Sequence, residues 1–523
     1  MHKAVTAFAI VGLLGLAGCG GTPDATRTVP AVSRSALAGQ ITARPCVYKE
    51  KDEKHKEAEF AARCGFIYVP EDRTKPNSRL IALPYQRILA RSRHPAEPLF
   101  ALAGGPGMSN MQFGLPVSWF VDRRDVVLVG YRGVDGTVRL DCPEVDAVMK
   151  GGGALLDSPA IAKLGEAYRQ CAARHRKAGV DLDGYTVLEV VDDLEAARRA
   201  LGYDRIDLSS ISYGTRIALI YGWRYPQHVL RSAMIGVNPP GRFRFDPALF
   251  DDHVRRYAAL CAADAHCAAR TKDLVADIHK ALDNMPDRWL GFPVNRDVVL
   301  ISTFMGLFST DSAAATFDMW IAAAKGDYSG MALVSAAYAM ILPPMQWGDF
   351  AAKGNSDIGP HSNFAADLTP GRYLIGAPMN VFACAVVKGW PLRAIPAEYR
   401  TARRSEVATL MLSGTLDVST PAETARNELL PLMPNARQVT LAEFSHADDL
   451  INFQPGATRH LLTTFYKTGR VDASQFKYRP VDFDPGGMSF PLLAKALVAI
   501  ALFAIAAVMG LAVWLFRRRR KVR

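Results

Sequence analysis

Continuous apolar runs in the first half of the chain predict strands that are covered on both faces. The clearest run is residues 126–129, within a strand-like segment at 125–130, and shorter runs precede it at 80–83 and 98–102. Strands without an exposed polar face are typical of parallel sheets, because such sheets carry helices on both sides. Residues 185–201 repeat apolar positions at helical spacing, with acidic residues near the start and basic residues near the end, which favours a helix. The pattern predicts an α/β architecture.

The pattern changes between residues 241 and 370, where apolar positions recur at helical spacing and strand-like runs are rare. Strand-like runs return at 407–412 and 437–441, and a helical stretch follows at 447–465. A helical insertion between strands of one sheet is typical of a cap that covers the sheet. We therefore expect the first part of an α/β core at 45–240, a helical cap at 241–370 and the second part of the core at 371–470.

The N-terminal residues have the organisation of a signal peptide. Lys3 precedes an uncharged apolar run at 4–16, and small residues then lead to Cys19. A cysteine directly after such small residues resembles a bacterial lipobox, so we expect a signal peptide over 1–18 and lipidation of Cys19. A plain signal peptide with a coincidental cysteine is the alternative. Residues 19–44 are rich in Gly, Ser, Thr, Ala and Pro, which predicts a flexible tether.

The C-terminal residues predict a membrane anchor. The uncharged run 496–516 would span roughly 30 Å as a helix, which is one bilayer core. We expect a linker at 471–491, a transmembrane helix at 492–516 and a basic tail at 517–523. Because basic tails stay in the cytoplasm, the body is expected on the periplasmic side of the cell membrane. A helix buried in the core of the protein is the alternative.

The overall charge does not indicate nucleic-acid binding. The net charge is +11, but six of the positive charges lie in the last seven residues, which leaves about +5 for the rest of the chain. No basic stripe interleaved with aromatic residues is present, so we expect no nucleic-acid partner. A hydrophobic content of 49% and a charged content of 22% are typical of a globular protein with a membrane component.

Cysteine usage fits an oxidising compartment. Seven cysteines remain beside Cys19, and six of them are near neighbours along the chain. Nearness suggests the pairs Cys46–Cys64, Cys142–Cys171 and Cys261–Cys267, although the sequence alone leaves their connectivity open. Cys384 has apolar neighbours and is expected to be a buried free thiol. No spacing resembles a zinc site, so we expect neither a metal nor a cofactor.

A small-x-Ser-x-Gly segment at 210–214 lies between a predicted strand at 203–208 and a predicted helix at 217–223. This arrangement is the nucleophile elbow of α/β-hydrolases, in which a serine sits on a sharp, strained turn. Residues two positions either side of that serine must be small, and Ser210 and Gly214 are. Ser212 is therefore the candidate nucleophile. The α/β-hydrolase fold with an inserted helical cap becomes the expected fold.

A serine hydroxyl needs a base, and the base needs a carboxylate that orients it. In α/β-hydrolases these groups follow the serine in the order acid then histidine, at the ends of late strands. Asp417 follows the predicted strand at 407–412, and His446 follows the next one at 437–441. A turn aspartate that caps a helix is the alternative for Asp417.

An oxyanion hole needs two backbone N–H donors. Tyr213, which follows the candidate nucleophile, can supply one. The loop Gly104-Gly105-Pro106-Gly107 follows a predicted strand and can supply the other, from Gly105 or from Gly104 if the loop shifts.

These motifs resemble the prolyl iminopeptidase and tripeptidyl aminopeptidase group of α/β-hydrolases. The resemblance rests on Leu102-Ala103-Gly104-Gly105-Pro106-Gly107, on the elbow, on Gly414-Thr415-Leu416-Asp417 and on Ser445-His446, and it covers roughly residues 46–470. It implies a serine exopeptidase that releases residues from peptide N-termini through an acyl-enzyme. In that reading Ser212 is the nucleophile, Asp417 orients and His446 is the base, and the paired cysteines resemble the secreted branch of the group. Ser210 and Gly130 depart from the residues usual in the group.

The substrate is less constrained than the chemistry. An esterase or amidase acting on a small acyl substrate with the same three residues is the main alternative, because a fold does not dictate the acyl group. A non-catalytic, membrane-tethered binding module is a further one. An aminopeptidase also needs acids that bind a substrate's ammonium group. The cap offers Asp251, Asp252, Asp311, Asp318 and Asp349, each of which is otherwise a solvated residue on a helix face.

Overall fold

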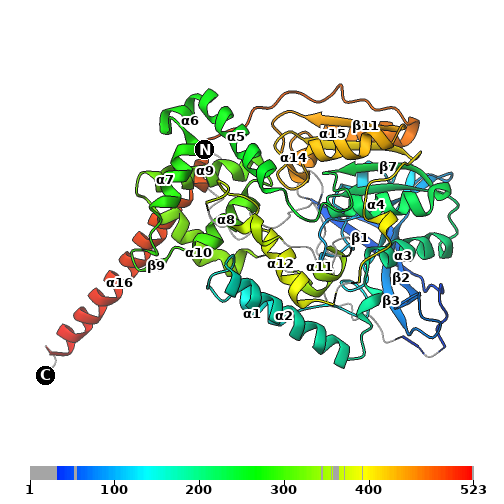
Figure 1. Ribbon diagram of the computed structural model, residues 1–523, viewed down its shortest axis with the longest axis horizontal. Coiled ribbons are helices and arrows are strands. Elements are labelled where there is room, and N and C mark those ends of the chain that lie inside the picture. The colour runs from blue at the N-terminus through cyan, green and yellow to red at the C-terminus, as the bar shows by residue number, and fades with distance from the viewer. Residues whose placement is uncertain are drawn as a thin grey trace.

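A nine-stranded sheet forms the centre of the molecule (Figure 1). The computed structural model describes residues 32–520, apart from 34, 52–55, 343–344, 355, 357–363, 370 and 392. The strand order is β1-β2-β3-β5-β4-β6-β7-β10-β11. The strands are β1 (Arg44–Lys51), β2 (Glu57–Pro70), β3 (Leu80–Ile88), β4 (Ala96–Leu102), β5 (Arg124–Val129), β6 (Ile206–Ile211), β7 (Val229–Ile235), β10 (Ala408–Gly414) and β11 (Ala436–Leu441).

The six strands from β5 to β11 pair in parallel, whereas β1, β2 and β3 form an antiparallel extension. The apolar runs at 80–83, 98–102 and 125–130 lie in β3, β4 and β5, and β5 is buried along its whole length. Strand β6 begins at Ile206 rather than at Tyr203 and continues to Ile211, directly before the elbow. The alternating polar strands β1 and β2 at the sheet edge were not expected.

Helices cover both faces of the parallel part of the sheet. On one face, α3 (Val187–Ala200) and α4 (Tyr213–Arg224) pack against β4, β5 and β6. On the other face lie α14 (Ala447–Asn452) and α15 (Pro455–Thr468), into which the expected helical stretch at 447–465 divides. The parallel part of the sheet is therefore buried between two layers of helices.

A layer of helices lies between β7 and β10 in sequence and covers the end of the sheet (Figure 1). It comprises α5 (Pro247–Ala263), α6 (Ala265–Arg270), α7 (Leu274–Asp283), α8 (Arg296–Gly306), α9 (Thr310–Ala324), α10 (Ser329–Ile341) and α11 (Trp347–Gly354). Its apolar cluster continues into α1 (Pro143–Met149), α2 (Ser158–Lys177) and α12 (Asn380–Gly389). The helical layer thus draws on segments outside the expected cap boundaries.

The cap also contains a two-stranded hairpin, β8 (Arg288–Trp289) and β9 (Phe292–Pro293), which the helical pattern did not predict.

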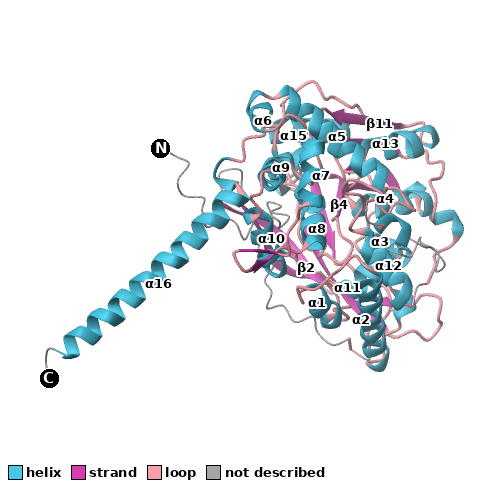
Figure 2. Cartoon of the chain, turned by 60° about the vertical axis from the view of Figure 1, so that its left-hand side comes forward, coloured by secondary structure: helices cyan, strands magenta, loops and turns pink. Residues whose placement is uncertain are grey.

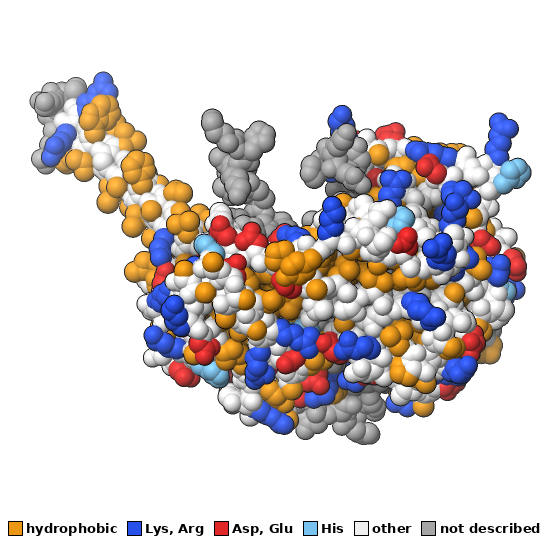
Figure 3. Space-filling model, turned by 90° about the horizontal axis from the view of Figure 1, so that it is seen from above, with side chains coloured by type: hydrophobic (Ala, Val, Ile, Leu, Met, Phe, Trp, Pro, Cys, Tyr) orange, Lys and Arg blue, Asp and Glu red, His pale blue; other side chains and the backbone are white. Residues whose placement is uncertain are grey.

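Helix α16 (Phe490–Arg520) projects from the body as a single long arm (Figure 2). Among the described residues it is the helix that is long and apolar enough to cross a membrane. Hydrophobic side chains cover the arm, and Lys or Arg side chains lie at its far end (Figure 3). It begins two residues before the expected span of 492–516 and ends four residues after it. The chain therefore enters the helix directly from the body.

At the other end, Gly39 and Thr42 donate backbone hydrogen bonds to Tyr68 and Phe66 of β2. The chain thus joins the sheet edge before the expected boundary at residue 45. The signal peptide and Cys19 lie outside the described residues.

Three disulfides join the cysteines in the expected pairs: Cys46–Cys64, Cys142–Cys171 and Cys261–Cys267. The first links β1 to β2, the second links the start of α1 to α2, and the third links α5 to α6. Cys384 is a buried free thiol in α12. Each disulfide therefore fastens one peripheral element to its neighbour.

Candidate active site

The site lies at the carboxyl ends of β4 and β6, where the chain begins to add strands to the opposite side of the sheet. Strand β4 is flanked by β5 on one side and by β6 on the other, so the connections leaving β4 and β6 diverge at their carboxyl ends. Such a switch point leaves a crevice in open parallel sheets. The loop after β4 carries Gly104, and the turn after β6 carries Ser212.

Ser212 has the strained backbone expected of a nucleophile elbow. Its φ is 53° and its ψ is −123°, a conformation that side chains rarely adopt. A Cβ on Gly214 would stand 2.3 Å from the carbonyl oxygen of Leu102, so the turn admits only glycine there. Ser210 is fully buried and donates to the carbonyl of Ala233 at 3.2 Å. The small residues thus let the elbow pack against β4 and β7.

Asp417 and His446 lie side by side at the ends of β10 and β11. His446 Nδ1 is 2.8 Å from Asp417 Oδ2, and both residues are buried. A Nδ1–H donor to this carboxylate leaves Nε2 as the free base. Asp417 Oδ1 also accepts from the backbone N–H groups of Ser419 and Thr420, at 2.9 and 2.8 Å. The carboxylate is therefore held in one orientation.

Thr420 is a partner that the sequence did not single out. Its hydroxyl donates to Asp417 Oδ2 at 2.7 Å and lies 3.1 Å from His446 Nδ1. Thr420 stands three residues after the candidate acid and shortly before a helix. That position was the available sequence signal, because Thr and Ser hydroxyls often form hydrogen bonds in such turns.

Asp417 and His446 each stabilise the charged form of the other. Burial raises the pKa of Asp417, but the facing imidazole and the hydrogen bonds outweigh burial and hold the pKa below its usual range. Burial lowers the pKa of His446, and the Asp417 carboxylate more than compensates and raises it.

The elbow and the imidazole meet at the end of β7. Ser212 N–H donates to the carbonyl of Ile235 at 2.8 Å. The next residue, Gly236, faces His446 so closely that its Cβ position is 2.8 Å from Cε1. The dipeptide Ile235-Gly236 therefore contacts both the candidate nucleophile and the candidate base.

The glycine loop after β4 lies against Ser212. A Cβ on Gly104 would be 3.2 Å from Ser212 Cβ and 3.7 Å from its Oγ. Gly105 has a φ of 126°, and its nearest neighbours are in its own loop. Tyr213, the other expected donor, is the first residue of α4. Of the two glycines, Gly104 is the one that the structure brings against the serine.

Buried side chains hold this loop from both sides. Asn110 accepts from Ala103 N–H at 2.7 Å and donates to the carbonyls of Ala101 and Val129. From the cap, Asp349 accepts from Gly107 N–H at 3.1 Å and is paired with Lys353 at 2.5 Å. The contact between Gly107 and Asp349 has no local signal in the sequence, because the two residues are 242 positions apart.

The five acids expected to face a substrate amine all have other partners. Asp251 accepts three backbone N–H groups of residues 374–376, and Asp349 serves the glycine loop. The remaining three are paired with arginines: Asp252 with Arg256, Asp311 with Arg479 and Asp318 with Arg270.

Two further acids follow His446 on α14. Asp449 is buried and accepts hydrogen bonds from Ser309 and Thr310 of the cap. It therefore joins the cap to α14, the helix that follows His446. Asp448 is half-buried, and its carboxylate has no hydrogen bond or ion pair with any described residue. Burial raises the pKa of Asp448, and the charge of His446 opposes this.

The cap reaches the base directly. Phe308, just beyond α8, accepts the backbone N–H of His446 at 3.1 Å, and its ring lies 5.4 Å from the imidazole. The cap also contains an apolar pocket with walls from α8, α10, α11 and α12. Its lining includes Met305, Met345 and Phe350, of which the last two also contact Gly107. The buried hydroxyls of Ser302 and Tyr338 in this lining have no partner among the described residues.

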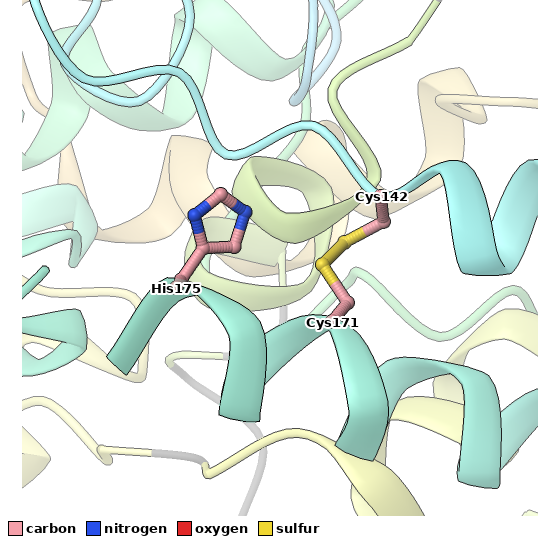
Figure 4. A group of neighbouring side chains, drawn as sticks. All are labelled: Cys142, Cys171 and His175. Atoms are coloured by element: carbon pink, nitrogen blue, oxygen red, sulfur yellow. A yellow bond between two sulfur atoms is a disulfide. The ribbon is translucent and has the colours of Figure 1, made fainter. Parts of the chain in front are cut away.

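One cluster resembles a metal site by distance alone. Cys142, Cys171 and His175 lie together (Figure 4), but the two sulfurs are joined as a disulfide. His175 Nε2 lies 2.8 Å from the carbonyl oxygen of Asp141. A disulfide sulfur is not the thiolate that binds a metal, so this group does not form a metal site while the disulfide is intact.

Comparison with known proteins bears on the fold and on the family. Residues 97–306 match the family described as alpha/beta hydrolase fold. The tripeptidyl aminopeptidase of Streptomyces lividans is 29% identical over 197 residues, which cover 34% of this chain and 36% of that protein. Serine protease Hip1 of Mycobacterium tuberculosis is 28% identical over 254 residues, which cover 43% and 47%. The fold is the α/β-hydrolase fold, and the resemblance to the aminopeptidase group is confirmed.

The chain spans less than half the length of the curated relatives it matches. Among solved structures, a proline iminopeptidase of Mycobacterium smegmatis aligns with 15% identity and a TM-score of 0.36, over 77% of this chain and 97% of that one.

Proposed function

We propose that this chain is a membrane-anchored serine hydrolase in which Ser212 is the nucleophile, His446 the base and Asp417 the orienting acid. The observation that carries the proposal is the 2.8 Å contact between His446 Nδ1 and Asp417 Oδ2, beside a serine at positive φ. Both features cost free energy to maintain, since one buries a charge and the other strains the backbone. Such costs are typical of active sites.

In the proposed mechanism His446 Nε2 takes the proton of Ser212 as its Oγ attacks the substrate carbonyl. Asp417 holds the imidazole in the required tautomer and stabilises the imidazolium that forms. The N–H of Tyr213, with that of Gly105 or Gly104, stabilises the oxyanion. His446 then returns the proton to the leaving group, and water, activated by the same imidazole, hydrolyses the acyl-enzyme.

The preferred substrate is a peptide cleaved from its N-terminus. Support comes from the relatives, which are a tripeptidyl aminopeptidase and a serine protease. An aminopeptidase needs an acid for the substrate's ammonium group, and Asp448 is the acid near His446 that lacks a partner. We assign it that role, in place of the five cap acids.

An esterase or amidase is the second candidate. Two observations favour it: the five cap acids are engaged elsewhere, and the pocket whose lining residues Met345 and Phe350 lie against Gly107 is apolar. An apolar cavity accepts an acyl chain as well as a prolyl or leucyl side chain.

We further propose that α16 crosses the cell membrane, with the body on the periplasmic side and the basic end in the cytoplasm. The exposed apolar surface of the helix and its Arg517–Arg518 end support this orientation.

A fluorophosphonate probe tests the chemistry. The full-length chain should be labelled, and Ser212→Ala should not be. Absence of labelling in the unsubstituted chain would overturn the hydrolase proposal and favour a binding module. Turnover of free-amine against N-blocked proline anilides and short-chain esters then separates the two candidates, because a preference for blocked or ester substrates excludes the aminopeptidase.

A further inference from the structure

The cap is fastened to the first turns of α16. Ser329 at the start of α10 donates to the carbonyl of Pro491 at 3.3 Å, and Asp327 pairs with Lys495 at 2.5 Å. Ala494 is buried, and α16 packs on both α9 and α10. Beyond Val498 the helix is exposed. If α16 crosses a bilayer, these contacts fix which face of the cap lies toward that bilayer.

The hairpin β8–β9 lies on this face. It packs on α10, and Figures 1 and 2 both place it on the side of the body from which α16 leaves. Its strands pair Arg288 with Pro293 and Trp289 with Phe292, and its turn is Leu290-Gly291. The turn residues have φ angles of 46° and 86°. The hairpin therefore presents Leu290 at its turn.

The tip of the hairpin carries exposed apolar side chains that do not pack in the core of the protein. Leu290 is 70% exposed and adopts a positive φ that leucine disfavours. Turns of this type favour Asn-Gly or Gly-Gly, so leucine here costs stability and buries nothing. Phe292, with 48% exposure, projects beside it. An apolar residue kept at such a position indicates a contact outside the chain.

A third exposed apolar side chain lies on α10, the helix on which the hairpin packs. Met340, near the end of α10, is 69% exposed. We define Leu290, Phe292 and Met340 as the hairpin face. Outside α16, the other large apolar side chains that are similarly exposed among the described residues are Leu37, Val47 and Tyr478. Two of these side chains therefore belong to the hairpin, and Met340 lies on α10, the helix on which the hairpin packs.

We propose that the hairpin face inserts into the headgroup region of the same bilayer that α16 crosses. Apolar side chains at such a boundary lie roughly 5–10 Å deep, and neighbouring basic residues bind lipid phosphates. Arg288 is exposed next to the tip and can supply that charge. The cap then rests on the membrane at two points, which holds the active site at a fixed height above the lipid surface. The proposal rests on α16 as a membrane helix but not on the hydrolase chemistry.

Site-directed spin labelling of the full chain in phosphatidylethanolamine–phosphatidylglycerol vesicles tests it. Labels at Leu290→Cys and Phe292→Cys should collide about tenfold less with an aqueous nickel chelate than a label at Val47→Cys, because lipid excludes the chelate. Val47 has the same 48% exposure as Phe292 and lies on β1, far from α16 in Figure 1. The unsubstituted chain gives the background from Cys384 and any other thiol.

A label at Phe503→Cys on α16 distinguishes failure of the hairpin proposal from failure of its premise that α16 crosses the bilayer. If this label is shielded but the two hairpin labels are as accessible as Val47→Cys, the hairpin proposal is wrong and the anchor stands. If Phe503→Cys is itself accessible, α16 does not cross the bilayer and the premise is wrong. Agreement of the Leu290 and Phe292 labels guards against a local effect of either substitution.

Discussion

Gly236 lies against the imidazole of His446: a Cβ at this position would stand 2.8 Å from Cε1 and 3.0 Å from Nδ1. The same residue has a φ of 63° and follows Ile235, which accepts the N–H of Ser212. The end of β7 therefore sets the distance between the candidate base and the candidate nucleophile. Sequence patterns gave no role to this glycine.

Gly236→Ala should displace the imidazole and lower kcat about 100-fold, since a shift near 1 Å costs that much in a preorganised site. Steady-state kinetics on the best substrate measures this. Gly222→Ala in α4 is the matched control, because its Cβ would meet Val407 at an ordinary 3.6 Å. That control should keep full activity and gain up to about 1 kcal/mol of stability from helix propensity. Equal activity in both variants would contradict the assignment of His446.

The Thr420 hydroxyl should matter for the same reaction. Thr420→Val keeps the shape but removes the 2.7 Å hydrogen bond to Asp417. A buried carboxylate that loses a donor is destabilised by about 1–3 kcal/mol, so we expect kcat to fall about tenfold with little change in KM. Thr420→Ser retains the hydroxyl and should restore most of the rate. A loss in both variants would indicate a packing role instead.

The pH profile reports on the ion pair. The base acts as neutral imidazole, and Asp417 raises the pKa of His446 above its ordinary 6.5. The acid limb of kcat/KM should therefore have its midpoint above that value. In Asp417→Asn burial, which lowers the pKa of His446, is opposed by the charges of Asp448 and Asp449 without that of Asp417, so the limb should move to lower pH while the rate falls about 10⁴-fold. An unmoved limb would show that another group titrates.

Asp349 and Lys353 form a buried ion pair, and removing one partner should destabilise the fold more than replacing both. Lys353→Met leaves an unpaired buried carboxylate under the glycine loop and should destabilise the fold by about 3–5 kcal/mol. Adding Asp349→Asn removes that charge and keeps an acceptor for Gly107. The double variant should therefore be more stable than Lys353→Met alone, by about 2 kcal/mol in urea denaturation. Additive losses would mean that the two groups do not interact.

Asp448 separates the two proposed substrates. Asp448→Asn should raise KM about tenfold for peptides with a free N-terminus, because a charge-assisted hydrogen bond contributes about 1.5–3 kcal/mol. N-blocked substrates should be unaffected. Asp311→Asn is the control, since Asp311 is already paired with Arg479. Equal effects on free and blocked substrates would remove the ammonium role.

The amino-acid sequence by itself determined the class of fold and the candidate chemical groups. Buried parallel strands require continuous apolar runs, and an elbow requires small residues around its serine, so both leave local signals at β5 and at residues 210–214. The order of Ser212, Asp417 and His446 after successive strands is a signal of the same local kind.

Beyond the Asp417–His446 pair, the contacts between polar groups follow from the tertiary structure. Asp349 was a candidate for binding substrate and instead holds Gly107, and Thr420 joins Asp417 to His446. The edge strands β1 and β2 have mostly polar residues between their buried positions, and the hairpin β8–β9 has two residues in each strand, so neither has a long apolar run that could reveal it. Contacts between residues hundreds of positions apart depend on how the cap packs, and no local pattern of hydrophobic and polar residues records that packing.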